Sequence, residues 1–253
     1  FISYFHWMIK VYPFVFLQIP IASWIVLHTF KPEYEILDSS VRKLVIKVAK
    51  SRKMTGRNTI TLIIFLLIFI GWVFFSNSLG LGIIALSGVF IYMVGGFVRW
   101  NDLNKYTHWG VILLFGATIS LGTNIRSTGA ALWLSNQILS IFGQIMETIP
   151  FFSDFIVIII TSAIGNILSS SATVAILAPI TMNLSPDTLH IGLVTAISSA
   201  FGYFTIVAAP ACTIIYSSGM IKASDFLKVG WRIGISSIIL LIIYINTYWL
   251  IVN

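Results

Sequence analysis

Long apolar runs alternate with short polar segments along most of this chain. Five runs without a charged residue approach the length of a membrane span, and each is predicted to be a helix, because only helices and closed barrels satisfy their backbone in lipid. These runs are Val11–Phe30, Thr59–Phe75, Leu79–Val98, Trp109–Asn124 and Ile233–Val252. The polar triplet Ser76-Asn77-Ser78 is predicted to form the turn between the second and third spans. Continuous rather than alternating apolar residues argue against barrel strands.

The charge-free stretch Phe155–Pro186 is too long for a single span. Its 32 residues would form a helix of about 48 Å, whereas a hydrocarbon core is about 30 Å thick. The polar run Ser169-Ser170-Ser171 divides the stretch into two arms that are each too short to cross. Two half-length arms that meet at a polar tip predict a re-entrant helical hairpin. Such backbone is tolerated at depth only where protein or a water-filled cavity covers it.

A second overlong stretch, Ile191–Ile221, is interrupted by the segment Ala208–Cys212. Pro210 within this segment cannot donate a backbone hydrogen bond and disfavours helix at the preceding residue. We therefore predict a broken helix, with two half-helices joined by a non-helical link at Ala208–Cys212.

The charge-free segment Ser127–Met146 has a mixed character. Asn136, Ser140 and Gln144 recur at a spacing of four, and apolar residues occupy the opposite face. The pattern favours an amphipathic helix that lies in the membrane interface. An ordinary spanning helix whose polar face turns toward neighbouring helices remains an alternative.

Composition supports an all-α polytopic membrane protein. Of the 253 residues, 58% are hydrophobic and only 9% are charged, against about 25% charged in soluble domains. Mean hydropathy is +0.97. These values exclude a soluble enzyme and a disordered chain, and the single cysteine, Cys212, excludes a disulfide scaffold. Because the sequence begins at Phe1 without an initiator Met, we expect it to be part of a longer protein.

The net charge of +7 does not indicate a nucleic-acid partner, because eight of the fifteen basic residues lie between Lys31 and Arg57 in one polar loop. If this loop (31–58) is cytoplasmic, counting passes along the chain puts 13 basic residues on the cytoplasmic side and 2 on the other. Basic residues gather in cytoplasmic loops. We therefore predict a cytoplasmic loop 31–58 and an external C-terminus.

The two interrupted elements are the candidate site. A hairpin tip exposes carbonyls that attract a cation such as Na⁺ and amides that attract an anion. Hydroxyls of Ser169, Ser170, Ser171 and Thr173 add oxygen atoms at the tip. Two broken helices in one half-protein are the sequence sign of a secondary transporter. Alone, the serines could be a packing feature and the proline a kink.

The sequence gives less support for a proton relay, an enzyme active site or a metal site. The middle of the spans carries no Asp, Glu, Lys or Arg, which argues against a proton relay through a buried carboxylate. The spans also contain no nucleophile–base pair and no cluster of metal ligands, so we expect no enzyme activity and no metal other than sodium.

Three segments resemble the divalent anion/sodium symporter family. "NILSSSATVAILAPI" (Asn166–Ile180) resembles the signature of its second hairpin, whose tip reads Ser-Asn-Thr. "THWGVILLFGATISLGTNIRSTGAALWL" (Thr107–Leu134) is similar to its Gly-rich helix and the horizontal helix that follows. "GYFTIVAAPACTIIYSSGMIKASDFLKVGW" (Gly202–Trp231) is similar to its broken helix, whose link reads Thr-Pro-Pro-Asn. The order of elements matches the C-terminal half of such a transporter.

The resemblance implies a set of binding residues. The expected substrate-binding residues are Ser169, Ser170, Ser171, Thr173, Pro210 and Cys212. The expected sodium-binding residues are Gly165, Asn166, Leu168, Ser170 and Ala209. Ser170 stands where the family has Asn, and Ala209 and Cys212 stand where its link has Thr and Asn. The first replacement loses a side-chain amide and the other two lose polar contacts, so sulfate or another small anion is as compatible as a dicarboxylate.

The resemblance implies a sodium-coupled symporter of small divalent anions, with Na⁺ as coupling ion and no organic cofactor. Expected partners are the anionic substrate, the lipid bilayer, the N-terminal half of the same transporter and a second copy in a homodimer. We expect three parts: 1–58 with the last helix of the first repeat and the basic loop, 59–149 with scaffold helices and the interfacial helix, and 150–253 as the transport unit. The alternatives are an arsenite/anion or Na⁺/H⁺ exchanger of the wider ion-transporter group and a non-transporting homologue.

Overall fold

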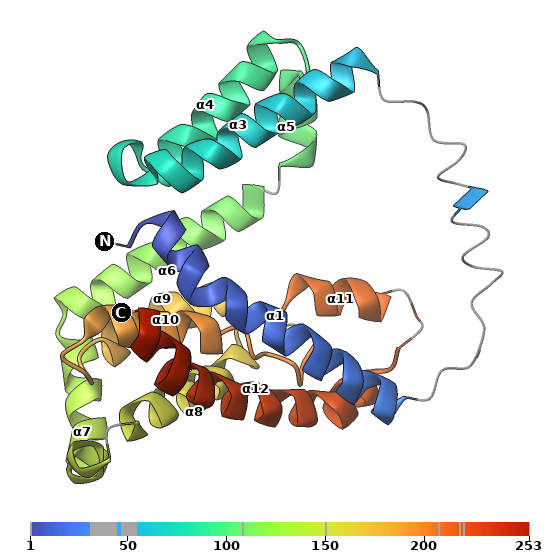
Figure 1. The fold of residues 1–253 in the computed structure, drawn as a ribbon. Helices are drawn as coiled ribbons and strands as arrows, with labels where there is room; N and C mark the ends of the chain where they lie inside the picture. The colour runs from blue at the N-terminus through green and yellow to red at the C-terminus, as the bar shows by residue number, and fades with distance from the viewer. Residues whose placement is uncertain are drawn as a thin grey trace. The chain divides into compact units, whose positions relative to one another are not determined.

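The computed structural model of this chain consists of α-helices, with no strand among the residues that it describes (Figure 1). Those residues are 2–30, 45–46, 55–107, 109–149, 151–206, 208–217, 219 and 221–252, without the side chains at 111, 114, 115 and 210. Most of the predicted cytoplasmic loop 31–58 therefore lies outside the described residues. The predicted all-α class is confirmed.

The chain forms two compact units. The first, Phe1–Ile9 with Lys31–His108, holds the first turns of α1 and the helices α3 (Gly56–Leu79), α4 (Leu81–Val94) and α5 (Trp100–Tyr106). The second, Lys10–Phe30 with Trp109–Asn253, holds the rest of α1 (Tyr4–Thr29) and seven further helices. These are α6 (Trp109–Ser127), α7 (Ala130–Thr148), α8 (Phe152–Gly165), α9 (Ser170–Thr181), α10 (Thr188–Ser198), α11 (Pro210–Ser217) and α12 (Ala223–Val252).

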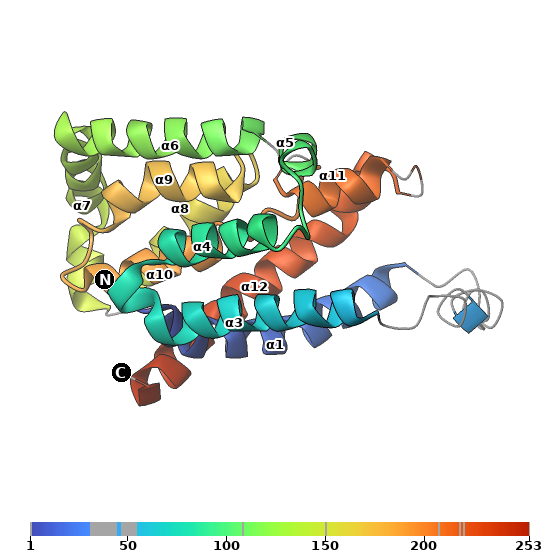
Figure 2. The same ribbon diagram turned by 90° about the horizontal axis from the view of Figure 1, so that it is seen from above.

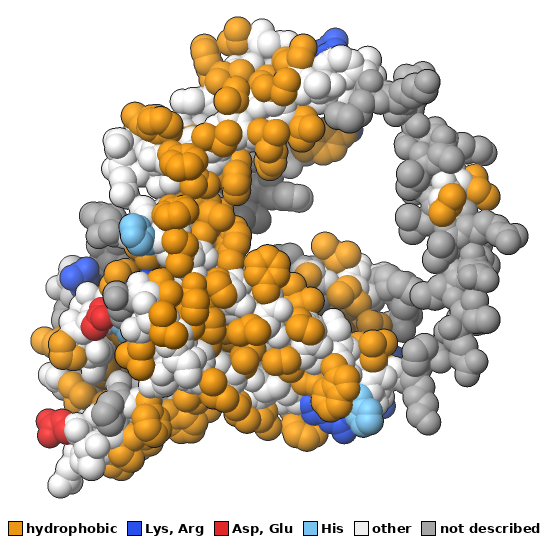
Figure 3. Space-filling view, in the orientation of Figure 1, with side chains coloured by type: hydrophobic (Ala, Val, Ile, Leu, Met, Phe, Trp, Pro, Cys, Tyr) orange, Lys and Arg blue, Asp and Glu red, His pale blue; other side chains and the backbone are white. Residues whose placement is uncertain are grey.

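Three of the described helices are long and apolar enough to cross a membrane. They are α1, α3 and α12, with 26, 24 and 30 residues and hydropathies of 1.6, 2.5 and 2.1. Large apolar side chains such as Phe16 and Leu86 are each 70% exposed, and hydrophobic side chains cover much of the face seen in Figure 3. An outward apolar surface of this extent suits lipid rather than water.

The turn between α3 and α4 lies at Gly80, so the prediction of a turn at Ser76-Asn77-Ser78 is wrong. The triplet continues α3, whose end is marked by a hydrogen bond from Gly80 N to Ser76 O (3.0 Å). Gly80 has φ +79°, a backbone conformation that glycine adopts without the steric cost of a Cβ atom. The chain therefore turns where backbone freedom allows it and not where the side chains are polar.

Helix α4 is shorter than the predicted span Leu79–Val98. It ends at Val94 after 14 residues, which corresponds to about 21 Å of helix. Gly95 and Gly96 follow, and Gly96 has φ +67°. The two glycines stop the helix before the apolar run ends.

The predicted hairpin of two short helices is confirmed within the second unit. α8 has 14 residues and α9 has 12, so the arms are about 21 and 18 Å long. The segment Asn166–Ser169 joins them. Helix α9 packs on α6, α7, α8 and α10, and it lies beside α6 in both ribbon views (Figure 2).

The predicted broken helix is also present, but the prediction of where it breaks is wrong. Helix α10 ends at Ser198 and α11 begins at Pro210, so the non-helical link comprises Ser199–Ala209 rather than Ala208–Cys212. Proline is well suited to the first position of a helix, where its missing N–H has no intrahelical partner. Pro210 therefore starts the second half-helix instead of lying in the link.

Helices α1 and α12 pack antiparallel, with hydrogen bonds at both ends and in the middle. Lys10 O accepts hydrogen bonds from Tyr244 Oη and Trp249 Nε1, both at 2.9 Å. Gln18 Nε2 donates to Ser237 Oγ at 2.6 Å. At the other end Arg232 Nη1 donates to Thr29 Oγ1 at 2.9 Å. These bonds link the first and last long helices of the chain.

Helix α7 is anchored at its N-terminal end. Ala131 packs with Leu177 and Ile180 of α9, and Ser135 Oγ donates to Ile180 O at 2.7 Å. Asn136, Ser140 and Gln144 are exposed. Both interpretations of this segment, interfacial and spanning, stay predictions.

Candidate functional site

The serine run begins helix α9. Ser169 is the N-cap, with φ −65° and ψ 149°, and its hydroxyl accepts a hydrogen bond from Ala172 N (3.4 Å). Ser169 O accepts from Thr173 N at 2.9 Å. The cap defines a helix N-terminus at the hairpin tip, which is an end that favours negative charge.

Asn166 connects the hairpin tip to the link of the broken helix. Its buried side chain donates from Nδ2 to Ser162 O (2.8 Å) and Phe201 O (3.3 Å) and accepts at Oδ1 from Phe204 N (2.8 Å). Its backbone carbonyl accepts from Thr205 Oγ1 at 2.6 Å. Three of these four bonds cross between the two interrupted elements, so Asn166 holds them in a fixed register.

Two glycines let the backbones of the hairpin and the link approach closely. A Cβ atom on Gly165 would lie 2.7 Å from Ser199 O, and one on Gly202 would lie 2.6 Å from Gly165 O. Each distance is shorter than van der Waals contact, so neither position accommodates a larger residue without movement of the backbone. The carbonyls of Gly165 and Ser199 therefore lie at the crossing of the two interrupted elements.

A cavity of about 690 Å³ lies along helices α6 and α9. Ser170, Ser171 and Ser199 are among its lining residues, and so is Arg126 in the last turn of α6. The remaining lining residues are Thr118, Ile119, Gly122, Thr123, Val174, Ala175, Ala178 and Pro179. Helix α6 approaches because Gly122 faces Ala175 O, which a Cβ there would approach to 2.4 Å.

Thr173 lies one turn into α9 and shares with Thr161 of α8 a buried hydroxyl that has no partner among the described residues. Its side chain is fully buried, and Oγ1 has no hydrogen-bond partner in the described part of the chain. Buried hydroxyls are nearly always hydrogen-bonded, and each exception requires an explanation.

The other predicted residues are less well placed for a shared site. Ala209 O accepts from Cys212 N (3.0 Å) and Thr213 N (3.3 Å), so it serves the first turn of α11. Cys212 is half-buried and is not part of the cavity wall, and the Pro210 side chain lies outside the described residues. Leu168 donates its N–H to Ile164 O (2.9 Å) at the end of α8.

Two cavity residues were not expected from the sequence. Ser199 begins the link between α10 and α11, which we predicted to begin only at Ala208, and Arg126 is one of the two basic residues that the pass count puts on the external side. Both reach the cavity through packing between helices that are far apart in sequence. The small residue Gly122 within α6 was the available signal for close packing of this helix.

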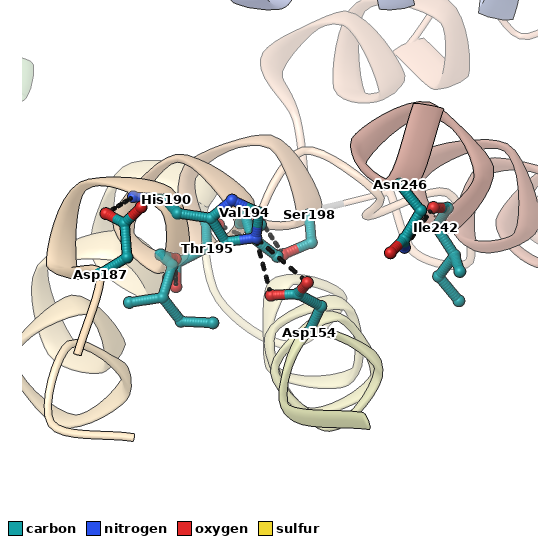
Figure 4. Close-up of polar contacts among 9 residues, drawn as sticks. Asp154, Asp187, His190, Val194, Thr195, Ser198, Ile242 and Asn246 are labelled. Carbon is teal, nitrogen blue, oxygen red and sulfur yellow. Dashed lines mark hydrogen bonds and ion pairs between the residues drawn. The ribbon is translucent and has the colours of Figure 1, made fainter. Parts of the chain in front are cut away.

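A histidine–carboxylate pair joins α8, the first arm of the hairpin, to α10. His190 Nε2 lies 3.0 and 3.1 Å from the two carboxylate oxygens of Asp154 (Figure 4). Asp187 caps the same turn of α10 by accepting from His190 N at 2.9 Å. The His190 ring also packs edge-on against Trp249, with centroids 5.1 Å apart. The hydrogen bond to Asp154 raises the pKa of His190, although partial burial opposes this effect.

An apolar helical bundle with a polar hairpin tip against a broken helix defines the class of multi-pass integral membrane transporters. The family model described as "Sodium:sulfate symporter transmembrane region" matches residues 1–253, and the chain belongs to this family. Because the family consists of transporters and not of enzymes, the expectation that the chain is not an enzyme is confirmed, as is the resemblance to divalent anion/sodium symporters.

The similar curated proteins include transporters from bacteria and an animal. An "Uncharacterized transporter" of Haemophilus influenzae is 24% identical over 96% of this chain and 55% of its own length. The "Sodium-dependent dicarboxylate transporter SdcS" of Staphylococcus saprophyticus is 24% identical over 96% of this chain and 50% of its own length. The "Sodium-dependent high-affinity dicarboxylate transporter 3" of Caenorhabditis elegans is 28% identical over 60% of this chain and 27% of its own length. The chain thus spans about half the length, or less, of these relatives.

Proposed function

We propose that the protein is a sodium-coupled symporter of small divalent anions such as dicarboxylates or sulfate. The observation that carries this proposal is the junction of the two interrupted elements, where Asn166 bonds the hairpin tip to the link. The names of the relatives from Staphylococcus saprophyticus and Caenorhabditis elegans, which mention sodium and dicarboxylates, support it. The family description mentions sodium and sulfate.

In this proposal Na⁺ binds where the hairpin crosses the link. The candidate ligands are carbonyl or side-chain oxygens of Gly165, Asn166, Leu168, Ser170 and Ala209. Hard oxygen atoms suit an alkali cation, and the close approach of the Gly165 and Ser199 backbones concentrates carbonyls in one place.

The anion in this proposal meets the N-terminus of α9. The candidate contacts are the hydroxyls of Ser169, Ser170, Ser171 and Thr173, together with Pro210 and Cys212 on the α11 side. Ser170 and Ser171 line the cavity along α6. Free amides at a helix N-terminus and nearby hydroxyls are the donors that carboxylate and sulfate require.

Sodium and anion would act together at this tip. Na⁺ would bind first and order the hairpin, so that the anion meets a prearranged set of donors and each ligand raises the affinity for the other. We further propose that 150–253 moves as the transport unit relative to the helices of 59–149. A preceding N-terminal half would supply the other half of the site, and two copies would form a homodimer.

Uptake into proteoliposomes tests the proposal. The protein expressed from its complete coding sequence is reconstituted, and radiolabelled succinate and sulfate are supplied under an inward Na⁺ gradient, a matched K⁺ gradient or a pH gradient without Na⁺. We expect uptake of at least one anion with Na⁺ and none with K⁺. Uptake driven by the pH gradient alone would instead indicate an exchanger. No uptake, with no stabilisation by Na⁺ or either anion, would indicate a non-transporting homologue.

A further inference from the structure

A second cavity lies between α1 and α12, away from the hairpin. Its volume is about 670 Å³, and it is lined by Trp24, Ile25, His28, Thr29, Lys228, Trp231 and Arg232. No acidic side chain is among these lining residues, and two are permanent cations. The transport site described above uses none of them.

The two cations face the cavity from the same side of α12. Lys228 and Arg232 are four residues apart, a spacing that puts both on one helix face. Arg232 Nη1 donates to Thr29 Oγ1 at 2.9 Å, which fixes one arm of its guanidinium against α1 and leaves further N–H groups for a ligand. Lys228 pairs with Asp225 at 3.7 Å, but its side chain is 66% exposed. Such an exposed pair is worth little and is easily exchanged for a better anion.

Two aromatic residues flank these cations. Trp24 stacks on His28, with ring centroids 5.6 Å apart and planes 11° apart. Trp231 lies under the guanidinium of Arg232 at 5.3 Å. Trp24 and Trp231 are 67% and 50% exposed. Exposed Trp beside Arg and Lys at the end of a spanning helix is typical of the headgroup level of a membrane.

Apolar side chains continue from the cavity along both helices. On α12, Trp231 is followed at intervals of four by Ile235, Ile239 and Ile243, which are 50%, 53% and 55% exposed. On α1, Leu17 lies two turns before Trp24 and is 49% exposed. The cavity therefore presents cations at one end and apolar rows that lead away from it, which matches a molecule with an anionic head and hydrocarbon tails.

We propose that this cavity binds the phosphate headgroup of an anionic glycerophospholipid, with Arg232 and Lys228 holding the phosphate and the acyl chains lying along the isoleucine row of α12. Basic cavities between membrane helices on the cytoplasmic side bind acidic headgroups. The basic loop that begins at Lys31 directly follows α1, and positive residues gather on that side of a membrane. A free phosphate shares the headgroup chemistry but has no acyl chain that could contact the apolar row.

Native mass spectrometry and thermal unfolding of the complete protein in detergent test the proposal. The probes are phosphatidylglycerol, phosphatidylcholine with the same acyl chains, and inorganic phosphate. We expect phosphatidylglycerol to stay bound and to raise the melting temperature, and the other two to have little effect. Equal retention of phosphatidylcholine, or stabilisation by inorganic phosphate alone, would overturn the lipid assignment.

Charge-neutralising variants locate the site. Each removed cation is expected to weaken phosphatidylglycerol binding by roughly fivefold, and Lys228→Gln with Arg232→Gln by roughly thirtyfold. Lys222→Gln makes the same change in charge just outside the cavity and should bind as the parent does. Lys228→Gln alone keeps the Arg232–Thr29 bond, so it reports on the site even if the double variant folds poorly. Unchanged binding by both Lys228→Gln and the double variant would refute the proposal.

Discussion

At the scale of single residues, the proposed anion site depends on hydroxyls at the start of α9. Ser170→Ala removes one of these hydroxyls from the cavity wall and leaves the Ser169 cap in place. A hydrogen bond to a charged group contributes about 1.5–3 kcal/mol, so the KM for the anion is expected to rise roughly tenfold or more. Uptake kinetics at saturating Na⁺ measure this, with Ser140→Ala on the exposed face of α7 as the control. An unchanged KM at equal expression would remove Ser170 from the site.

A second prediction at the residue scale concerns Gly165 and tests only the close approach of two backbone segments. Gly165→Ala would bring a Cβ to 2.7 Å from Ser199 O, and overpacking against backbone costs about 1–3 kcal/mol. Gly143→Ala on α7 is the matched control, because its nearest neighbour would be 4.0 Å away. Alanine there should be neutral or stabilise the helix by about 0.5–1 kcal/mol. Thermal unfolding in detergent compares the two, and equal stability of both variants would contradict the close crossing.

The residues of the site were only partly predictable. Ser169 to Ser171 could be found because a polar triplet inside a 32-residue charge-free stretch is a local signal. The structural role of Asn166 was not visible, because its partners Phe201, Phe204 and Thr205 come from a link at least 35 residues away. The positions of Ser199 and Arg126 at the cavity could not be predicted for the same reason, because contacts between helices far apart in sequence produce no periodic pattern in the sequence.

At the scale of elements, the ion pair between His190 and Asp154 connects α8 with α10 and gives a pH dependence. The pKa of His190 is raised mainly by its hydrogen bond to Asp154, Asp187 also raises it, and Lys10 opposes them. A raised pKa in the folded state means that the contribution is full below the unfolded value of about 6.5 and is lost as pH rises through the folded value. The stabilisation that this pair contributes should therefore fall from pH 6 to pH 9, as melting temperatures of the parent and of a variant without the pair would measure.

The variant Asp154→Asn tests the origin of that dependence. It removes the main cause of the raised pKa, so the variant should lose about 1 kcal/mol at pH 6 and much less at pH 9. Asp225→Asn, which breaks the exposed pair with Lys228, is the control and should keep the parent's pH profile. If the stability of Asp154→Asn depends on pH in the same way as that of the parent, the pair between His190 and Asp154 does not couple stability to pH.

Element boundaries were harder to predict than element types. The hairpin and the broken helix follow from length, because neither charge-free stretch fits one span. The breaks themselves followed backbone chemistry: Gly80 rather than the polar triplet turns the chain after α3, and Pro210 starts α11 instead of ending a helix. Polarity is a weak marker of turns in membrane helices, because Ser and Asn side chains can hydrogen-bond to carbonyls of the preceding turn.

At the scale of the whole molecule, the distribution of basic residues predicts topology. The loop 31–58 should be cytoplasmic and the C-terminus external, since this arrangement puts 13 basic residues inside and 2 outside. Alkaline phosphatase fused after Asn253 in the complete protein should be active, because the enzyme folds only outside the cytoplasm. The same fusion within the loop should be inactive and serves as the control. The reverse result would overturn both the pass count and the assigned side of the lipid cavity.

The pairing of α1 with α12 has a consequence for biosynthesis. Lys10 O and its partner Trp249 Nε1 are 239 residues apart, and a ribosome that adds about 5–20 residues per second needs roughly 12–50 s to span that interval. During this time Gln18, which bonds to Ser237 in the finished protein, leaves the ribosome without its partner. Until Ser237 has been synthesised, the Gln18 amide must therefore be hydrated or hydrogen-bonded to another group.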